Sequence, residues 1–234
     1  MSGVGGVLAG TRVPLGVLPS GTSNSFAAAL GIPTDTSEAC RLIVDGPRRI
    51  VDTLRCGDRV GILHAMIGLH AEVIAATTTE SKQRWGALAY FFQGLRQLGS
   101  LSTFRVEISD GDRRYEGDAV ALAIANMAPP KTAFAQGPAR VVGDDGLLDV
   151  TIVTAQNAGD VLAAGFELVR SALAGEEARD HRVVTLRTRS VRVLCEPQQD
   201  IMLDGEEAGT TPQTFLSVAR DLVVIAPGAD GIDR

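Results

Sequence analysis

The sequence predicts an α+β fold, in which a small α/β segment is followed by a larger, mainly antiparallel β domain that carries helices. A strand, a glycine turn and a helix follow one another in residues 13–30. Apolar stripes at helical spacing recur at only a few later places, and the final third alternates short apolar runs with turns. We place the first domain at residues 1–48 and the second at 49–234, and we expect the last strands to pack back on the first domain.

The first domain contains one predicted strand and two predicted helices. Val13 to Leu18 is a short apolar run that predicts a buried strand, and the Pro-Ser-Gly-Thr sequence after it breaks the strand. Phe26 to Leu30 begins a helix. A second helix is predicted from Thr36 to Val44, capped by Thr36 or Ser37, because its apolar residues share one face.

The middle of the chain predicts two hairpins separated by a helix. Arg49 to Ile67 contains two apolar segments around a Cys-Gly-Asp-Arg turn. Apolar residues from Trp85 to Leu98 recur at spacings of three and four, which predicts a helix with a buried stripe. Phe104 to Ser109 and Tyr115 to Asn126 flank an Asp-Gly-Asp turn and predict the second hairpin.

The final part predicts one helix among short strands. Leu147 to Val153 is a strand, and Asn157 with Asp160 three residues later predicts a helix start. That helix ends before Gly175, and its predicted buried face consists of Val161, Leu162, Phe166, Val169 and Leu173. The remaining predicted strands are Arg182–Thr188, Val191–Leu194, Ile201–Leu203, Thr214–Val218 and Leu222–Ile225.

Composition excludes several classes of function. A formal net charge of −6 argues against nucleic-acid binding, which requires a basic face. The three cysteines are widely spaced, so neither a disulfide framework nor a zinc site is predicted. The N-terminal residues lack the pattern of a signal peptide, and no apolar run reaches the roughly 20 residues of a membrane span. Cytoplasmic location is the expectation.

Three polar segments are candidate sites, and each also has an ordinary structural interpretation. The segment PSGTSNSF combines a glycine with hydroxyl and amide groups at a helix start, where a phosphate can bind. Its alternative is a capped helix after a tight turn. The turns GDDG before Leu147 and LDGEE after Met202 place carboxylates where Mg²⁺ or a proton could be held. Either can equally be a solvated hairpin turn.

Taken in order, these segments resemble the bacterial diacylglycerol kinases and related lipid kinases, including the sphingosine kinases. VPLGVLPSGTSNSFAAALGIP is similar to that family's P-x-G-T-x-N-D loop and helix, although Ser25 stands where many members have aspartate. GDDGLLDVTIV and IMLDGEEAGTTP resemble its two acidic turns. The resemblance implies a partial α/β nucleotide-binding domain followed by a mainly antiparallel β-sandwich domain with helices.

The resemblance also implies roles for individual residues. It puts Gly21, Thr22, Asn24 and Ser25 at the ATP phosphates. Asp204 and Glu206 would lie beside the transferred phosphoryl group, one as Mg²⁺ ligand and the other as candidate base. The resemblance does not assign which residue has which role. Asp145, with the carbonyls of Val142 and Leu147, would match the family's structural Mg²⁺ site, and Asp52 matches an acidic position near the cleft.

The implied reaction is ATP-dependent phosphorylation of a lipid hydroxyl, that of diacylglycerol or a related lipid, within phospholipid metabolism. The cofactors would be ATP and Mg²⁺. The partners would be the lipid alcohol and a membrane surface touched from the side, and a homodimer is a possible arrangement. An NAD kinase-like phosphotransferase and a non-catalytic lipid-binding remnant are the alternatives.

The family's Gly-Gly-Asp-Gly-Thr nucleotide loop would lie immediately before Met1. We therefore expect the chain to be truncated, and on its own to show negligible ATP-dependent lipid phosphorylation.

Overall fold

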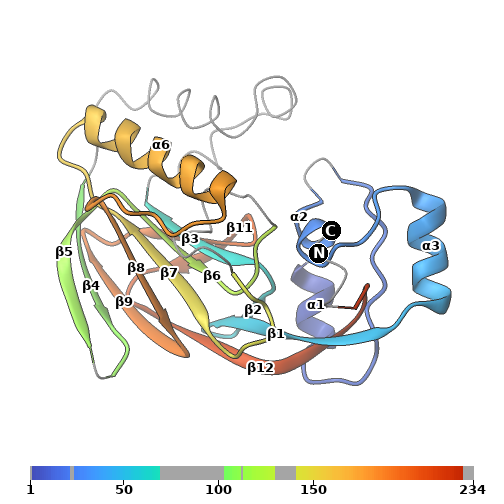
Figure 1. The fold of residues 1–234 in the computed structure, drawn as a ribbon. Coiled ribbons are helices and arrows are strands. Elements are labelled where there is room, and N and C mark those ends of the chain that lie inside the picture. Colours follow the sequence, from blue (N-terminus) through green and yellow to red (C-terminus); the bar gives the residue numbers. More distant parts are fainter. Residues whose placement is uncertain (1, 22–23, 69–102, 112, 130–140, 229–234) are drawn as a thin grey trace.

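Two six-stranded sheets packed face to face form most of the protein (Figure 1). The computed structural model describes residues 2–21, 24–68, 103–111, 113–129 and 141–228. Every strand pairing within the two sheets of this described part is antiparallel. The predicted α+β class with a mainly antiparallel sandwich is confirmed.

The first sheet has the strand order β2-β1-β12-β9-β4-β5. Its strands are β1 Arg48–Cys56, β2 Arg59–Gly61, β4 Phe104–Ser109, β5 Arg114–Ala119, β9 Ser190–Glu196 and β12 Gln213–Ile225. The second sheet has the order β11-β10-β3-β6-β7-β8. Its strands are β3 His64–Gly68, β6 Ala121–Ala125, β7 Leu148–Val153, β8 Val183–Thr188, β10 Asp200–Leu203 and β11 Glu206–Thr210.

The inner faces of the two sheets share one apolar core. Leu54 and Phe215 of the first sheet and Ile124 and Ile152 of the second sheet belong to it, and all four are fully buried. Strands β6 and β7 are buried along their whole length. The sequence of β6 is a continuous apolar run, as expected of a strand that is buried on both faces, whereas β7 also buries the polar residues Asp149 and Thr151.

The predicted strand Tyr115–Asn126 is divided at Val120, and its two halves enter different sheets. Strand β5 pairs with β4 in the first sheet, whereas β6 pairs with β3 and β7 in the second. The Val120 amide donates to the carbonyl of Val153, which holds the crossing point. Residue 120 is apolar and buried like its neighbours, so the pattern of the sequence gives no sign of the division.

A second, smaller core joins the N-terminal segments to the long ends of β1 and β12. It contains Val17, Phe26, Leu30, Val51 and Val224. The helices around it are α1 Ser2–Leu8, α2 Ser25–Ala29 and α3 Thr36–Asp45, and in Figure 1 they lie beyond the sandwich where β1 and β12 extend. Helix α1 was not predicted, since its glycine-rich sequence has low helix propensity. The domain division at residues 48 and 49 stays a prediction.

Two local predictions for the N-terminal part are wrong. Residues 13–18 form a single parallel bridge from Leu15 to Val224 instead of a buried strand, and Val13 and Leu18 are exposed. In the described part, β12 is their only strand partner. Helix α3 is capped by Asp35, whose carboxylate accepts the amide of Glu38 at 2.9 Å, and not by Thr36 or Ser37.

Helix α6 (Ala158–Ala174) lies over the strands of the second sheet (Figure 1). Its start is the predicted one, because the Asn157 side chain accepts the Asp160 amide at 3.0 Å. The predicted buried face is wrong at Phe166, whose exposed fraction is 68%, whereas Val161, Ala164 and Leu168 are buried. Of the predicted face, Val161 is therefore confirmed and Phe166 is wrong. The side chains of residues 162, 169 and 173 lie outside the described part.

Glu167 on α6 gives a testable dependence of stability on pH. Its carboxylate accepts the Arg170 guanidinium at 2.7 and 2.8 Å and the Arg179 amide at 2.9 Å. The hydrogen bonds from Arg170 lower the pKa of Glu167 most, the Arg179 amide lowers it further, and together they bring it to about 2. A pKa that is lower in the folded state means that the charged carboxylate stabilises the fold at pH values above the unfolded-state pKa. This stabilisation is lost as the pH falls from the unfolded-state pKa through the folded-state pKa of about 2.

We expect Glu167→Gln to lower the free energy of unfolding by about 1 kcal/mol at neutral pH, since the pair is near solvent. The difference from wild type should shrink as the pH falls below about 4. Urea unfolding at several pH values measures it, with the exposed Glu177→Gln as the matched control. An equal deficit at every pH would contradict the assigned pairing.

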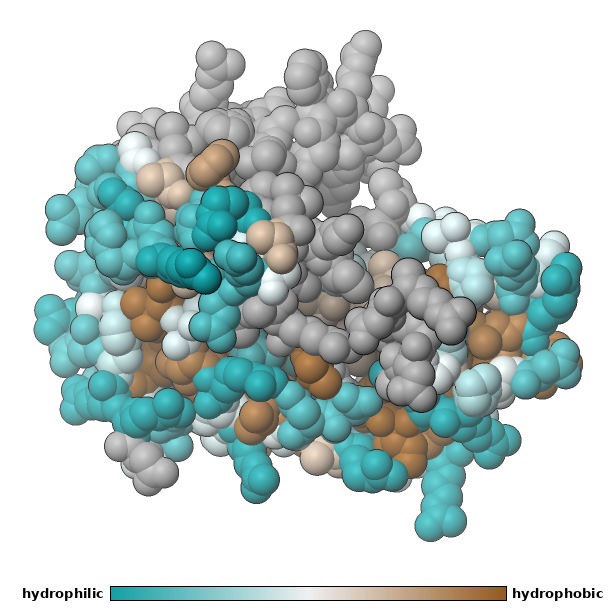
Figure 2. Space-filling view, in the orientation of Figure 1, coloured by the Kyte–Doolittle hydropathy of each residue, from teal (hydrophilic) through white to brown (hydrophobic). Residues whose placement is uncertain are grey.

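No helix in the described residues is long and apolar enough to span a membrane. In the face seen in Figure 2, hydrophobic residues of the described part form small separate groups among hydrophilic ones. The predicted helix from Trp85 to Leu98 lies outside the described residues.

Candidate active site

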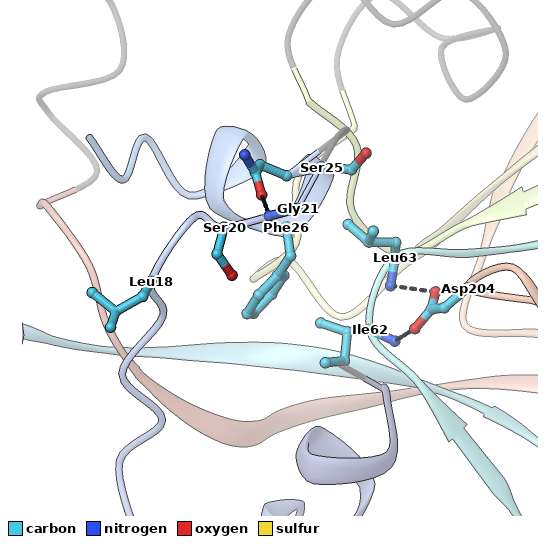
Figure 3. Close-up of a pocket in the computed structure, with 9 residues that line it drawn as sticks. Leu18, Ser20, Gly21, Ser25, Phe26, Ile62, Leu63 and Asp204 are labelled. Atoms are coloured by element: carbon cyan, nitrogen blue, oxygen red, sulfur yellow. Dashed lines mark hydrogen bonds between the residues drawn. The ribbon is translucent and has the colours of Figure 1, made fainter. Parts of the chain in front are cut away.

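A pocket of about 320 Å³ lies between the N-terminal loop and the turn that follows β10 (Figure 3). The loop side supplies Ser20, Gly21, Asn24 and Ser25, and the sandwich side supplies Asp204. The remaining lining residues are apolar: Leu18, Phe26, Ile62 and Leu63. The structure therefore brings together two of the three segments singled out in the sequence, which are about 180 residues apart. Thr22 lies outside the described residues.

Asp204 is held by three backbone amides from one segment. Its Oδ2 atom accepts the amide of Ile62 at 2.7 Å, and Oδ1 accepts those of Leu63 and His64, each at 2.9 Å. Its own amide donates to the His64 carbonyl at 2.9 Å. The carboxylate thus ties the β10–β11 turn to the connection between β2 and β3, and its oxygens are largely occupied.

The turn itself has the geometry that the Asp-Gly pair predicts. Asp204 has φ 51° and Gly205 φ 88°, and strands β10 and β11 pair on either side of them. Two successive positive φ angles are typical of a type I′ hairpin turn, which Asn-Gly and Asp-Gly favour. The turn of the β10–β11 hairpin therefore also forms part of the candidate site.

Asn126, which is not among the predicted site residues, holds the other side of the segment that Asp204 binds. Its side-chain amide donates to the carbonyls of Ile62 at 2.8 Å and Asp52 at 3.0 Å. The backbone amides of Asn126 and Met127 both donate to the Leu63 carbonyl. Asn126 is fully buried at the end of β6, so a polar residue ending a buried apolar run was the available signal.

Glu206 lies in β11, two residues after Asp204, and its side chain is exposed. Within the described part of the chain, no hydrogen bond or ion pair engages its carboxylate, and it is not one of the residues lining the pocket. Glu207 follows it in the same strand and is also exposed. Successive strand residues point to opposite faces, so only one of the two can face the pocket side of the hairpin.

Asp52 is fully buried and joins three segments. Its Oδ1 accepts the Arg220 amide at 2.7 Å and its Oδ2 the Gly146 amide at 2.6 Å. Its own amide donates to the Gly143 carbonyl at 2.8 Å. With these contacts Asp52 connects β1 to a bulge in β12 and to the GDDG turn, and it does not line the pocket.

The GDDG turn is separate from the Asp204 turn in its contacts. The Oδ1 atom of Asp145 accepts the Leu147 amide at 3.0 Å, and its Oδ2 pairs with the guanidinium of Arg187. Asp204 shares neither partner. Among the described residues there is no group of three or more histidine, cysteine or acidic side chains suited to a metal. Asp145 and Asp204, which the resemblance assigns to two different Mg²⁺ positions, therefore lie in two separate turns, and the assignments of Asp145, Val142, Leu147 and Asp204 to metal stay predictions.

Burial changes the ionisation of two groups near these turns. Burial lowers the pKa of His64, and the charge of Asp204 opposes this. Burial also raises the pKa of Asp149 to about 6, against the effect of Arg187. The lowered pKa keeps His64 neutral at neutral pH, so it adds no positive charge beside the pocket.

Comparison with known proteins identifies both parts of the chain. The diacylglycerol kinase catalytic domain matches residues 1–56, and the YegS C-terminal NAD kinase beta sandwich-like domain matches residues 64–229. The chain is 38% identical over 227 residues to "Uncharacterized protein sll0036" of Synechocystis sp., covering 97% of this chain and 52% of that protein. It is 34% identical over 220 residues to "Probable lipid kinase YegS-like" of Pseudomonas syringae pv. tomato, covering 94% and 70%.

Among solved structures, a diacylglycerol kinase from Bacillus anthracis str. Sterne superposes with a TM-score of 0.72 at 24% identity, covering 94% of this chain and 70% of that one. This likeness supports the fold. The chain spans about half the length of the Synechocystis relative. Because a family domain matches residues 64–229 and the Pseudomonas relative is 34% identical, the chain belongs to the diacylglycerol kinase family of lipid kinases, which are phosphotransferases.

Proposed function

We propose that the protein transfers the terminal phosphoryl group of ATP to the hydroxyl of a lipid alcohol, with diacylglycerol as the first candidate. The observation that carries the proposal is the pocket lined by Gly21 and Asn24 on one side and Asp204 on the other. Phosphoryl transfer requires a phosphate-binding loop facing an acidic group, with little covalent chemistry from the protein. The match of residues 1–56 to the diacylglycerol kinase catalytic domain and the 34% identity to a probable lipid kinase support a lipid as the acceptor.

The loop side of the pocket is the proposed position of the ATP phosphates. Asn24 adopts a left-handed conformation with φ 46°, and its Oδ1 accepts the Gly21 amide at 2.8 Å. A Cβ atom at Gly21 would lie 3.3 Å from that oxygen, so a larger residue there would push the Asn24 side chain aside by a few tenths of an ångström. Ser25 adds a hydroxyl at the start of α2. We propose Gly21, Thr22, Asn24 and Ser25 as the phosphate-binding residues.

Mg²⁺ bound with ATP would neutralise phosphate charge during transfer. On the sandwich side Asp204 would hold such an ion through its remaining acceptor capacity, whereas the carboxylate of Glu206 is unengaged in the described part of the chain. A carboxylate has about four lone-pair sites, and three hydrogen bonds already use most of them on Asp204.

This difference assigns the two acidic residues different proposed roles. Asp204 positions the pocket wall through its three amide bonds. Glu206, whose carboxylate has no described partner, is the proposed base that accepts the proton of the lipid hydroxyl. A general base needs a free lone pair within reach of the proton, and Glu206 meets the first condition better than Asp204.

We expect Glu206→Gln to lower the rate of lipid phosphorylation about 100-fold with little change in thermal stability, since general-base catalysis contributes 10²- to 10⁴-fold. The matched control is Glu207→Gln, one residue along the same strand and on its other face. The assay uses radiolabelled ATP and diacylglycerol in mixed micelles. The protein assayed is the full-length product of its gene. Equal losses in both variants would contradict the role of Glu206.

Two further arms separate the alternatives. NAD offered in place of the lipid tests the NAD kinase-like reaction, and phosphorylation of NAD alone would overturn the lipid assignment. Flotation with lipid vesicles tests the proposed peripheral contact with a membrane, which follows from a lipid acceptor. Vesicle binding without any transfer from ATP would instead identify a non-catalytic lipid-binding protein.

A further inference from the structure

The GDDG turn carries an arrangement of charges that the family resemblance does not predict. Arg187 lies in β8 directly opposite Asp149 of β7. Its Nε donates to Asp149 Oδ1 at 2.8 Å, while its Nη2 donates to Asp145 Oδ2. One guanidinium therefore joins the turn to the strand that follows it, through two different carboxylates.

The other polar groups of the turn are also engaged by protein atoms. Asp145 Oδ1 accepts the Leu147 amide, and the Gly146 amide donates to Asp52. The carboxylate of Asp144 pairs with Arg49 at 3.5 Å. Asp149 is 1% exposed, and its Oδ2 is buried with no hydrogen-bond partner in the described structure. In the described structure, the buried end of the cluster thus has one acceptor atom, Asp149 Oδ2, that receives no hydrogen bond.

This arrangement does not fit a divalent cation at Asp145. Mg²⁺ requires about six oxygen ligands at roughly 2.1 Å in near-octahedral geometry. Oδ2 of Asp145 binds the Arg187 guanidinium and Oδ1 accepts the Leu147 amide. A cation at this carboxylate would therefore lie beside a fixed positive charge or would have to displace it. An arginine held between two carboxylates supplies the same kind of charge neutralisation, and its planar fork suits two acceptors at once.

We propose that Arg187 takes the place of the structural divalent cation at the GDDG turn, as a counter-ion built into the chain. Its guanidinium neutralises Asp145, and its bond to Asp149 anchors the turn on β7. The turn is then held without metal. The proposal does not depend on kinase activity, and its test has no activity readout.

The first test is thermal unfolding without nucleotide, in EDTA and in millimolar MgCl₂ or CaCl₂. We expect the wild-type Tm to be the same in all three solutions. Arg187→Gln should lower the Tm in EDTA by about 5 °C, because two carboxylates lose their counter-charge. Calcium should then restore part of this loss in a saturable way, since it binds the folded form only. Arg189→Gln, an exposed arginine two residues away, is the matched control.

The second test locates any ion that binds. Terbium luminescence should be weak in the wild type and strong in Arg187→Gln, and Asp145→Asn in the double variant should abolish it. The proposal is overturned if the wild type is stabilised by Mg²⁺ in a way that Asp145→Asn removes. It is also overturned if Arg187→Gln unfolds like Arg189→Gln. Should Arg187→Gln fail to fold, Arg187→Lys keeps the charge with one contact, and the response of the wild type to EDTA still decides.

Discussion

Replacing Asp204 with asparagine should lower the free energy of unfolding by roughly 2 to 3 kcal/mol and reduce lipid phosphorylation more than 100-fold. Asparagine keeps the size of the side chain and the Asn-Gly pair favours the same type I′ turn, so the backbone at φ 51° is not strained. The change removes the negative charge and one acceptor oxygen while keeping the shape of the side chain. A –NH₂ group replaces one oxygen and faces an amide of residues 62–64 that can only donate.

The loss of activity should exceed that expected from partial unfolding. Ile62 and Leu63 form one wall of the pocket, and without the Asp204 carboxylate their backbone amides lose the acceptor that fixes them, while Asn126 and Met127 still bind their carbonyls. A displacement of about 1 Å at a positioning group can cost 10²-fold in rate. The measurements are urea unfolding and the radiolabelled assay at a temperature where the variant stays folded.

Asp200→Asn is the matched control, since Asp200 is exposed at the start of the same strand. Stability unchanged in Asp204→Asn would contradict the three amide bonds. Stability lost with the rate unchanged in the folded fraction would show that the Asp204 turn is only structural, and the proposed site would have to lie elsewhere.

The sequence predicted the order of the candidate segments but not the partners of their side chains. The Asp-Gly hairpin and the Asn157 cap are local, so residues three or four apart suffice to predict them. The amides that bind Asp204 are about 140 residues earlier in the chain. Arg187 and Asp149 meet through the register of β7 and β8. That register cannot be predicted from the pattern of residues within either strand alone.

The irregularity in β12 lies where the sequence predicted one, but it is a bulge and not a turn between two strands. The sequence predicted two strands separated by residues 219–221, whereas β12 is one strand of 13 residues. The pairing with β1 passes from Val51–Leu222 to Thr53–Val218. Three residues of β12 therefore lie opposite Asp52, and Arg220 among them has φ 56°. The polar interruption was a bulge, not a turn.

Asp52 fills that bulge, and its replacement should give the largest loss of stability. We expect Asp52→Asn to lower the free energy of unfolding by about 3 kcal/mol, or the Tm by roughly 6 to 12 °C. The carboxylate accepts two backbone amides at 2.6 and 2.7 Å in a fully buried position. Hydrogen bonds to a charged acceptor contribute about 1.5 to 3 kcal/mol each, and asparagine can accept only one of the two without turning a donor toward the other.

The same variant decides between two roles for Asp52, an acidic residue of the reaction and an anchor of the fold. An anchor predicts faster hydrogen exchange at the amides of Gly146 and Arg220, with phosphorylation by the folded fraction nearly unchanged. Asp58→Asn, in the exposed β1–β2 turn, is the matched control and should alter neither. A large fall in rate at constant stability would place Asp52 in the reaction. The two amide bonds and the position outside the pocket favour the anchor, because a group that acts on substrate must reach it.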